Sequence, residues 1–171
     1  TIGDTQSTPH RFIQASLAEL ICKDWGNEDS IHIFLTKDAE EKNWNDPPKN
    51  SEEIKRQKEY DWENENYKGL SKIFDSLNLP FSREKITPVR VAEGWKEEER
   101  WEIFNKIVAQ VNDNDEIYFD MTHSFRYLPM LAIIALNYIR VVKKNIKIRG
   151  IYYGAFEALG PAYQVKVLPI E

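Results

Sequence analysis

Cysteine and long apolar runs are scarce in this chain of 171 residues. The single cysteine, Cys22, excludes an intrachain disulfide framework and indicates a reducing compartment. Its apolar helical surroundings favour core packing over a role as a nucleophile. The longest apolar run covers residues 130–136, far short of the roughly 20 residues that span a bilayer. No signal peptide opens the sequence, so we expect a soluble, cytoplasmic protein without a membrane partner.

Positive charge is also limited, since the formal net charge is -5. Non-specific binding to long nucleic acid usually depends on a basic field, so we expect no long nucleic acid as a partner. A small anionic ligand needs only a few local donors and is compatible with this charge.

Common phosphate and metal motifs are missing. Neither G-x-G-x-x-G nor G-x-x-x-x-G-K-[ST] occurs, which argues against a dinucleotide cofactor and against a triphosphate in a P-loop. The three histidines, His10, His32 and His123, do not have metal-ligand spacing. We therefore predict no cofactor and no metal.

The chain does contain an alternation of strand-like and helix-like segments. We expect strands at residues 1–2, 31–36, 86–91, 117–119, 146–153 and 163–168, and helices at 11–22, 51–77, 95–111 and 127–142. This order predicts an α/β fold with a doubly wound, mostly parallel Rossmann-like sheet flanked by helices. We interpret residues 1–171 as a single domain. Because the first strand is cut short, we expect the chain to be a piece of a longer protein.

Two expectations concern the helix surfaces. Trp95 and Trp101 are expected to be packing residues. Residues 130–136 are apolar on every face of their helix, which predicts burial on more than one side. A dimer interface would account for this, and so would a sheet on one side with a helix on the other.

In an open α/β sheet, ligands bind beyond the carboxyl ends of the strands, where the strand order reverses. For the common order 3-2-1-4-5, the loops after the first and fourth strands lie at that point. The first loop is dense in small hydroxyl side chains and holds one glycine; its residues are Gly3, Asp4, Thr5, Gln6, Ser7 and Thr8. Its glycine lets the backbone approach a ligand, and amides before a helix favour an anion. The alternative is a simple turn with a helix cap.

The second loop contains Thr122, His123 and Ser124, three hydrogen-bonding residues in a row, followed by Phe125 and Arg126. The Arg126 guanidinium could bind a phosphate through two nitrogens, and the following helix N-terminus adds positive potential. Asp120 could be a cap or could orient His123 or Arg126. The structural alternative is an internal Asp120–Arg126 salt bridge with His123 partly buried beside it.

Residues 120–130, DMTHSFRYLPM, resemble the motif of the DxTHG family of CRISPR-associated proteins, whose sensor is the CARF domain. The similarity continues in order through residues 34–39 with Asn43 and Trp44, through 101–104 and through 150–156, and so spans most of the chain. This sequence has Ser124 where the family usually has glycine. It also keeps only one glycine of the usual Gly-Thr-Gly in the first loop.

The resemblance implies a homodimer with a symmetric pocket across its two-fold axis. A cyclic oligoadenylate, commonly the tetra-adenylate, would bind there as the messenger of type III CRISPR complexes and switch on an effector. By the match, the ligand-binding residues are Gly3, Asp4, Thr5, Gln6, Ser7, Thr36, Lys37, Thr122, His123, Ser124, Phe125, Arg126, Tyr153 and Gly154.

Three functions remain open from the sequence, and the binding sensor is preferred. In the second, a metal-independent ring nuclease, His123 acts as general acid or base and Arg126 stabilises charge. The third is an unrelated domain that binds a mononucleotide. The R-x4-6-H motif of the usual ribonuclease effector is absent. The effector would therefore lie on the missing part of the chain or on another chain.

Overall fold

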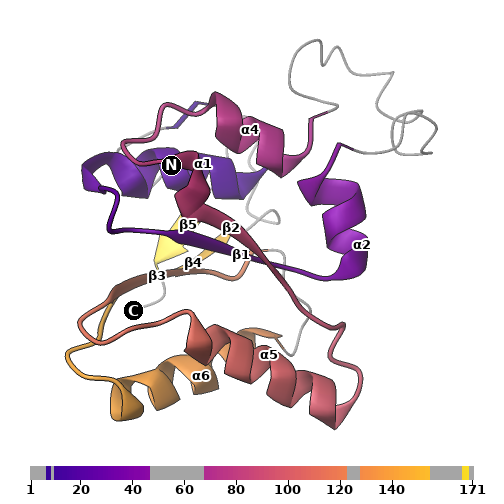
Figure 1. Ribbon diagram of the computed structural model, residues 1–171, viewed down its shortest axis with the longest axis vertical. Coiled ribbons are helices and arrows are strands. Elements are labelled where there is room, and N and C mark those ends of the chain that lie inside the picture. Colours follow the sequence, from indigo (N-terminus) through magenta and orange to yellow (C-terminus); the bar gives the residue numbers. More distant parts are fainter. Residues whose placement is uncertain (1–6, 9, 47–67, 123–127, 155–166, 170–171) are drawn as a thin grey trace. The chain divides into compact units, whose positions relative to one another are not determined.

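The computed structural model describes residues 7–8, 10–46, 68–122, 128–154 and 167–169 (Figure 1). The chain divides into two compact units. The N-terminal unit is Ser7–Val91, and the C-terminal unit contains Ala92–Glu171.

The N-terminal unit pairs two parallel strands and carries short helices. Its elements are α1 (Ile13–Ile21), η1 (Cys22–Asp24), β1 (Ile31–Leu35), α2 (Lys37–Ala39), η2 (Glu40–Trp44), α4 (Leu70–Ser76), η3 (Arg83–Lys85) and β2 (Ile86–Arg90). Strand β1 runs parallel to β2, in a register that pairs Ile31 with Ile86 and Leu35 with Arg90. The carboxyl ends of the two strands therefore lie side by side.

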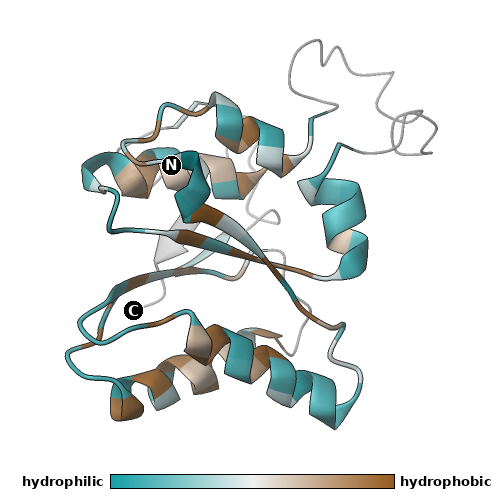
Figure 2. Cartoon of the chain, viewed as in Figure 1, coloured by the Kyte–Doolittle hydropathy of each residue, from teal (hydrophilic) through white to brown (hydrophobic). Residues whose placement is uncertain are grey.

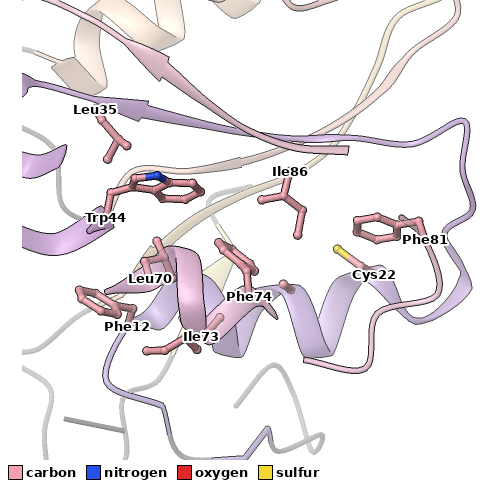
Figure 3. Packing of buried hydrophobic residues seen from close by; sticks show 11 residues of the cluster. Phe12, Cys22, Leu35, Trp44, Leu70, Ile73, Phe74, Phe81 and Ile86 are labelled. Atoms are coloured by element: carbon pink, nitrogen blue, oxygen red, sulfur yellow. The ribbon is translucent and has the colours of Figure 1, made fainter. Parts of the chain in front are cut away.

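One apolar core holds the N-terminal unit together. Helices α1 and α4 mix hydrophobic and hydrophilic residues, as helices with one buried face do (Figure 2). Helix α4 buries Leu70, Ile73 and Phe74, which share one face at helical spacing. Figure 3 shows these side chains gathered with Trp44 and Cys22, among others. Cys22 is buried, which confirms its predicted role in the core.

The C-terminal unit contains a second, mixed sheet. Its elements are α5 (Glu97–Ala109), β3 (Glu116–Asp120), α6 (Leu128–Val142), β4 (Lys147–Gly154) and β5 (Val167–Pro169). Strand β3 is parallel to β4, and β4 is antiparallel to β5. Helices α5 and α6 contact each other, with the Phe104 and Tyr138 ring centroids 5.3 Å apart.

Two asparagine turns set the start of the parallel pair. Asn114 and Asn145 adopt positive φ angles of 72° and 55°, a conformation that asparagine tolerates better than most residues. Asn145 Nδ2 donates to Asn114 Oδ1 at 2.9 Å. This bond ties the turn before β3 to the turn before β4, so the two strands enter the sheet together.

The parallel pairs and their helices confirm the predicted α/β, Rossmann-like class. In the region expected to be helical from residue 51 to 77, the described helix is α4, which begins after Gly69. The remainder, residues 51–67, lies outside the described residues, as does the strand expected at residues 1–2. Helix α2 and the η2 turn were not expected from the sequence.

One expectation about apolar surfaces needs correction. Trp95 and Trp101 are 72% and 58% exposed, so the prediction that they are packing residues is wrong. Within the described residues of the single chain, helix α6 buries one face, and the expected burial of a second face stays a prediction. Its buried residues are Ala132, Ala135, Leu136 and Ile139, whereas Met130, Ile133 and Ile134 are exposed. Across the described chain, each helix is too short or too polar to cross a lipid bilayer.

Candidate functional site

Among the residues that the structure describes, each unit has one pair of parallel strand ends, and ligands of α/β folds bind at such ends. In the C-terminal unit they are the ends of β3 and β4, where Asp120 pairs in register with Tyr152. The Met121 N–H donates to the Tyr152 carbonyl at 2.9 Å and extends the pairing by one step. Thr122 therefore leaves the sheet beside the last residues of β4, Tyr153 and Gly154.

The Asp120 carboxylate organises the residue that follows β3. Its Oδ1 accepts from the Thr122 N–H at 3.1 Å and from the Thr122 hydroxyl at 2.5 Å. This local turn is typical of an aspartate at a strand end. Because the Thr122 hydroxyl donates its proton to Asp120, its oxygen can make further hydrogen bonds only as an acceptor.

Strand β4 presents two tyrosines to opposite faces of the sheet. An added Cβ at Gly150 would lie 2.7 Å from the Tyr152 hydroxyl oxygen and 2.8 Å from its ring. Tyr152 therefore covers Gly150 on one face and is itself buried. Burial, together with the nearby Tyr118, raises the pKa of Tyr152, so its hydroxyl stays protonated. Tyr153 points to the other face and is 38% exposed.

Helix α6 begins at Leu128, six residues after Thr122, with Pro129 in its first turn. The 15-residue helix contributes a partial positive charge at its N-terminus. His123, Ser124, Phe125 and Arg126 lie between Thr122 and this helix and outside the described residues. Their predicted roles stay predictions.

In the N-terminal unit, Thr36 directly follows β1 and caps α2. Its hydroxyl accepts from the Ala39 N–H at 3.3 Å. The neighbouring Lys37 ammonium is exposed and lies 3.9 Å from Glu41. At the end of β2, the Arg90 Nε donates to Glu40 at 2.8 Å. Arg90 was not among the residues predicted for the site, and its partner Glu40 lies 50 residues away in the chain.

The first-loop predictions fall mainly outside the structure's described ranges. Gly3, Asp4, Thr5 and Gln6 lie there, whereas Ser7 is described and partly buried in the N-terminal unit. Thr122, Tyr153 and Gly154 come together in the C-terminal unit, and Thr36 and Lys37 lie together in the N-terminal unit. Among the residues with described positions, no three His, Cys, Asp or Glu side chains form a metal-binding group.

A comparison with protein families identifies the family of this chain. The family described as "CRISPR system endoribonuclease Csx1, CARF domain" matches residues 10–157, which include residues of both units. The chain belongs to the Csx1 CARF-domain family. This confirms the resemblance predicted from residues 120–130.

A curated relative of the CARF-domain chain supports the same assignment. The chain is 43% identical over 75 residues to CRISPR-associated protein MJ1674 of Methanocaldococcus jannaschii. The matched segment covers 42% of this chain and 12% of that protein. The chain therefore corresponds to a small part of this relative.

Proposed function

We propose that this CARF-domain chain is a sensor of a type III CRISPR system that binds a cyclic oligoadenylate, with cyclic tetra-adenylate as the first candidate. The observation that carries the proposal is Thr122, held by Asp120 at the carboxyl end of β3 beside Tyr153 and Gly154, in a chain of this family. This is the edge at which an α/β fold binds its ligands.

The chemistry of the ligand suits these groups. A cyclic oligoadenylate offers adenine amino groups and ribose hydroxyls as donors, and the Thr122 oxygen can accept from them. Its phosphates need donors, which the N-terminus of α6 and the predicted residues His123, Ser124 and Arg126 would supply. Local donors are sufficient, so a net charge of -5 is no obstacle.

We further propose that α6 forms the homodimer interface. Opposite its buried face, α6 carries a second row of large apolar side chains: Met130, Ile133, Ile134 and Val141. We call this row the α6 apolar face. Monomeric proteins rarely expose large contiguous apolar surface, and a two-fold axis lets one helix face cover its own copy.

The effector is proposed to lie outside this sequence. The matched segment covers 12% of the relative MJ1674, and the family description names an endoribonuclease. An RNA-cleaving effector on another part of the protein, or on another chain, would then respond to ring binding at the CARF domain.

Calorimetric titration with cyclic tetra-adenylate and cyclic hexa-adenylate tests the proposal, with the ring analysed by chromatography afterwards. We expect one ring for every two chains, recovered intact. Recovery as linear fragments would replace the sensor with a ring nuclease, and His123→Ala would then abolish cleavage. Absence of binding to both rings would refute the proposal.

A matched pair of variants tests the site. Thr122→Val keeps the shape of the side chain but removes its acceptor, and we expect the dissociation constant for the ring to rise about tenfold. Thr87→Val makes the same change within β2, where the hydroxyl bonds His32 Nδ1 at 2.9 Å. That variant should keep the wild-type affinity. Equal affinities of the two variants would exclude Thr122 from the site.

A further inference from the structure

Helix α5 exposes a large aromatic side chain that is joined to α6 through ring contacts. Trp101 is 58% exposed, and its ring lies nearly perpendicular to that of Phe104, with the ring centroids 5.7 Å apart. Phe104 is buried, and its ring centroid lies 5.3 Å from that of Tyr138, which is 47% exposed. The two helices lie side by side within the C-terminal unit (Figure 1). Tyr138 is four residues from Ile134, so this chain of rings connects the surface of α5 to the α6 apolar face.

The α6 apolar face is small for a dimer interface on its own. It consists of four side chains that are between 43% and 84% exposed. A fully exposed aliphatic side chain of this size offers about 100 Å² of apolar area, so the four together offer on the order of 250 Å². Specific protein interfaces bury about 800 Å² on each partner. A dimer formed through this face must therefore cover neighbouring surface, and the chain of rings makes α5 the neighbour that is continuous with it.

The opposite flank of α6 points away from α5. Tyr138 faces α5, and Arg140 is two residues further on, which places it about 200° around the helix. Ile133 is seven residues before Arg140 and therefore lies on the same side of the helix, nearly two turns away. Both side chains are exposed. We call Ile133 and Arg140 the far flank of α6.

Trp101 lines an acidic hollow on the outer side of α5. The hollow has a volume of about 630 Å³, is open to solvent, and has Glu98, Glu102 and Lys106 as its charged lining. Lys106 pairs with Glu102 at 2.6 Å, so the hollow keeps a net negative charge. This chemistry is complementary to the far flank, which combines an aliphatic side chain with a guanidinium. An arginine can stack on a tryptophan ring and donate to a carboxylate with the edge of its guanidinium.

A two-fold axis in the plane of the interface allows two arrangements of the paired α6 helices. If the axis runs across α6, the helices are antiparallel and α5 lies against its own copy, so the two acidic hollows meet and repel each other. If the axis runs along α6, the helices are parallel, and α5 of each copy lies over the far flank of its partner. The second arrangement places each hollow against Arg140, and charge complementarity of this kind selects between alternative dockings.

We propose that Trp101 anchors a parallel homodimer: the Trp101 ring of each copy packs between Ile133 and Arg140 of its partner, and the same Arg140 pairs with Glu98. The inference rests on the proposed α6 dimer. It extends that interface to α5 and fixes the relative direction of the two α6 helices. Tryptophan and arginine are among the side chains that most often dominate the binding energy of interfaces. The contact is made twice, once on each side of the axis, so it adds aromatic area at both edges of the α6 apolar face.

Sedimentation equilibrium of single variants tests the anchor. We expect Trp101→Ala to raise the dimer dissociation constant about 30-fold, because it removes both copies of the contact. Trp95→Ala is the matched control, since it removes the same side chain at a position that is 72% exposed and precedes α5. It should dimerise like the wild type. Circular dichroism spectra of both variants should match that of the wild type, which shows that they fold.

A charge exchange tests the orientation. Arg140→Glu places like charges opposite each other at Glu98 and should raise the dimer dissociation constant about tenfold. Adding Glu98→Arg to Arg140→Glu restores opposite charges across the parallel interface, and we expect the dissociation constant to return to within about threefold of the wild type. A double variant that stays as weak as Arg140→Glu would overturn the parallel arrangement.

Three further results separate this inference from the dimer on which it rests. If Trp101→Ala dimerises like the wild type while Ile134→Glu does not, the α6 interface remains and its extension to α5 is overturned. Equal losses for Trp95→Ala and Trp101→Ala would also overturn the extension, because any exposed tryptophan would then contribute as much. A wild type that is monomeric at every concentration measured would refute the proposed dimer and the inference with it.

Discussion

The two units of this chain differ in how far their large apolar side chains are buried. The N-terminal unit gathers its large apolar residues into one buried cluster that includes Trp44, Ile73 and Phe74. Among the side chains that the structure describes, those that are large, apolar and exposed all belong to the C-terminal unit. The same contrast holds for the helices, since α4 buries its apolar residues whereas α6 also exposes a second apolar row.

This contrast separates stability from interaction. A closed core stabilises its own unit and is sensitive to any change in volume. An exposed apolar face contributes little to the stability of a unit alone, and it becomes stabilising when a partner covers it. We therefore expect substitutions in the N-terminal unit to change unfolding, and substitutions on the α6 apolar face to change association.

Glycine substitutions provide the strongest test of the contrast. A Cβ at Gly69 would collide with the backbone of Trp44 and Asn45, which cannot yield locally, whereas a Cβ at Gly150 meets the movable Tyr152 side chain. We expect Gly69→Ala to lower the free energy of unfolding by about 3 kcal/mol and Gly150→Ala by about 1 kcal/mol. Urea denaturation followed by tryptophan fluorescence measures both.

Gly26→Ala is the control within the N-terminal unit, because an added Cβ there has no atom within 4 Å. It should change the free energy of unfolding by less than about 0.5 kcal/mol. Equal losses for Gly26 and Gly69 would show that backbone freedom, not close packing, sets the cost in this unit.

A charge on the α6 apolar face tests the second half of the contrast. Ile134 is 58% exposed, so Ile134→Glu should leave the unfolding of a monomer nearly unchanged. We expect it to raise the dimer dissociation constant about 30-fold, or ~2 kcal/mol, because a charge at the centre of an interface is poorly solvated. Sedimentation equilibrium measures the effect. Trp95→Glu, at an even more exposed position outside α6, should dimerise like the wild type. If Ile134→Glu dimerises normally, the interface lies elsewhere.

Regular elements could be predicted from the sequence because their signals are local. Strands β1 and β2 and helices α5 and α6 lie within a few residues of the segments expected for them. The short α2 and η2 turns depend instead on the Thr36 cap and on the burial of Trp44 against Phe74, 30 residues away in the chain. Trp95 and Trp101 were misjudged because apolar character alone does not show whether a surface is covered.

The contacts near the candidate site also divide into local ones and ones between residues distant in the sequence. From the sequence, Asp120 was expected to be a cap or to orient His123 or Arg126, and the structure shows that it bonds the Thr122 N–H and hydroxyl, two residues on. Arg90 and Glu40, by contrast, pair although they lie 50 residues apart in the sequence. No pattern in the sequence marks this pair, because tertiary packing brings its members together.

A further prediction concerns Cys22, inside the closed core of the N-terminal unit. Burial, with a contribution from Asp29, raises the pKa of the Cys22 thiol to about 12 from 9.0. The folded pKa lies above the unfolded one, so the associated stability is fully present below pH 9 and declines as the pH rises toward 12.

At pH 8 we expect iodoacetamide to modify folded Cys22 about a thousandfold more slowly than the unfolded chain, which mass spectrometry measures. A Cys22→Ala/Glu28→Cys variant places the thiol at an exposed position and should react rapidly. Equal rates for folded and unfolded Cys22 would mean that the core of the N-terminal unit opens readily, and the contrast between the two units would then be lost.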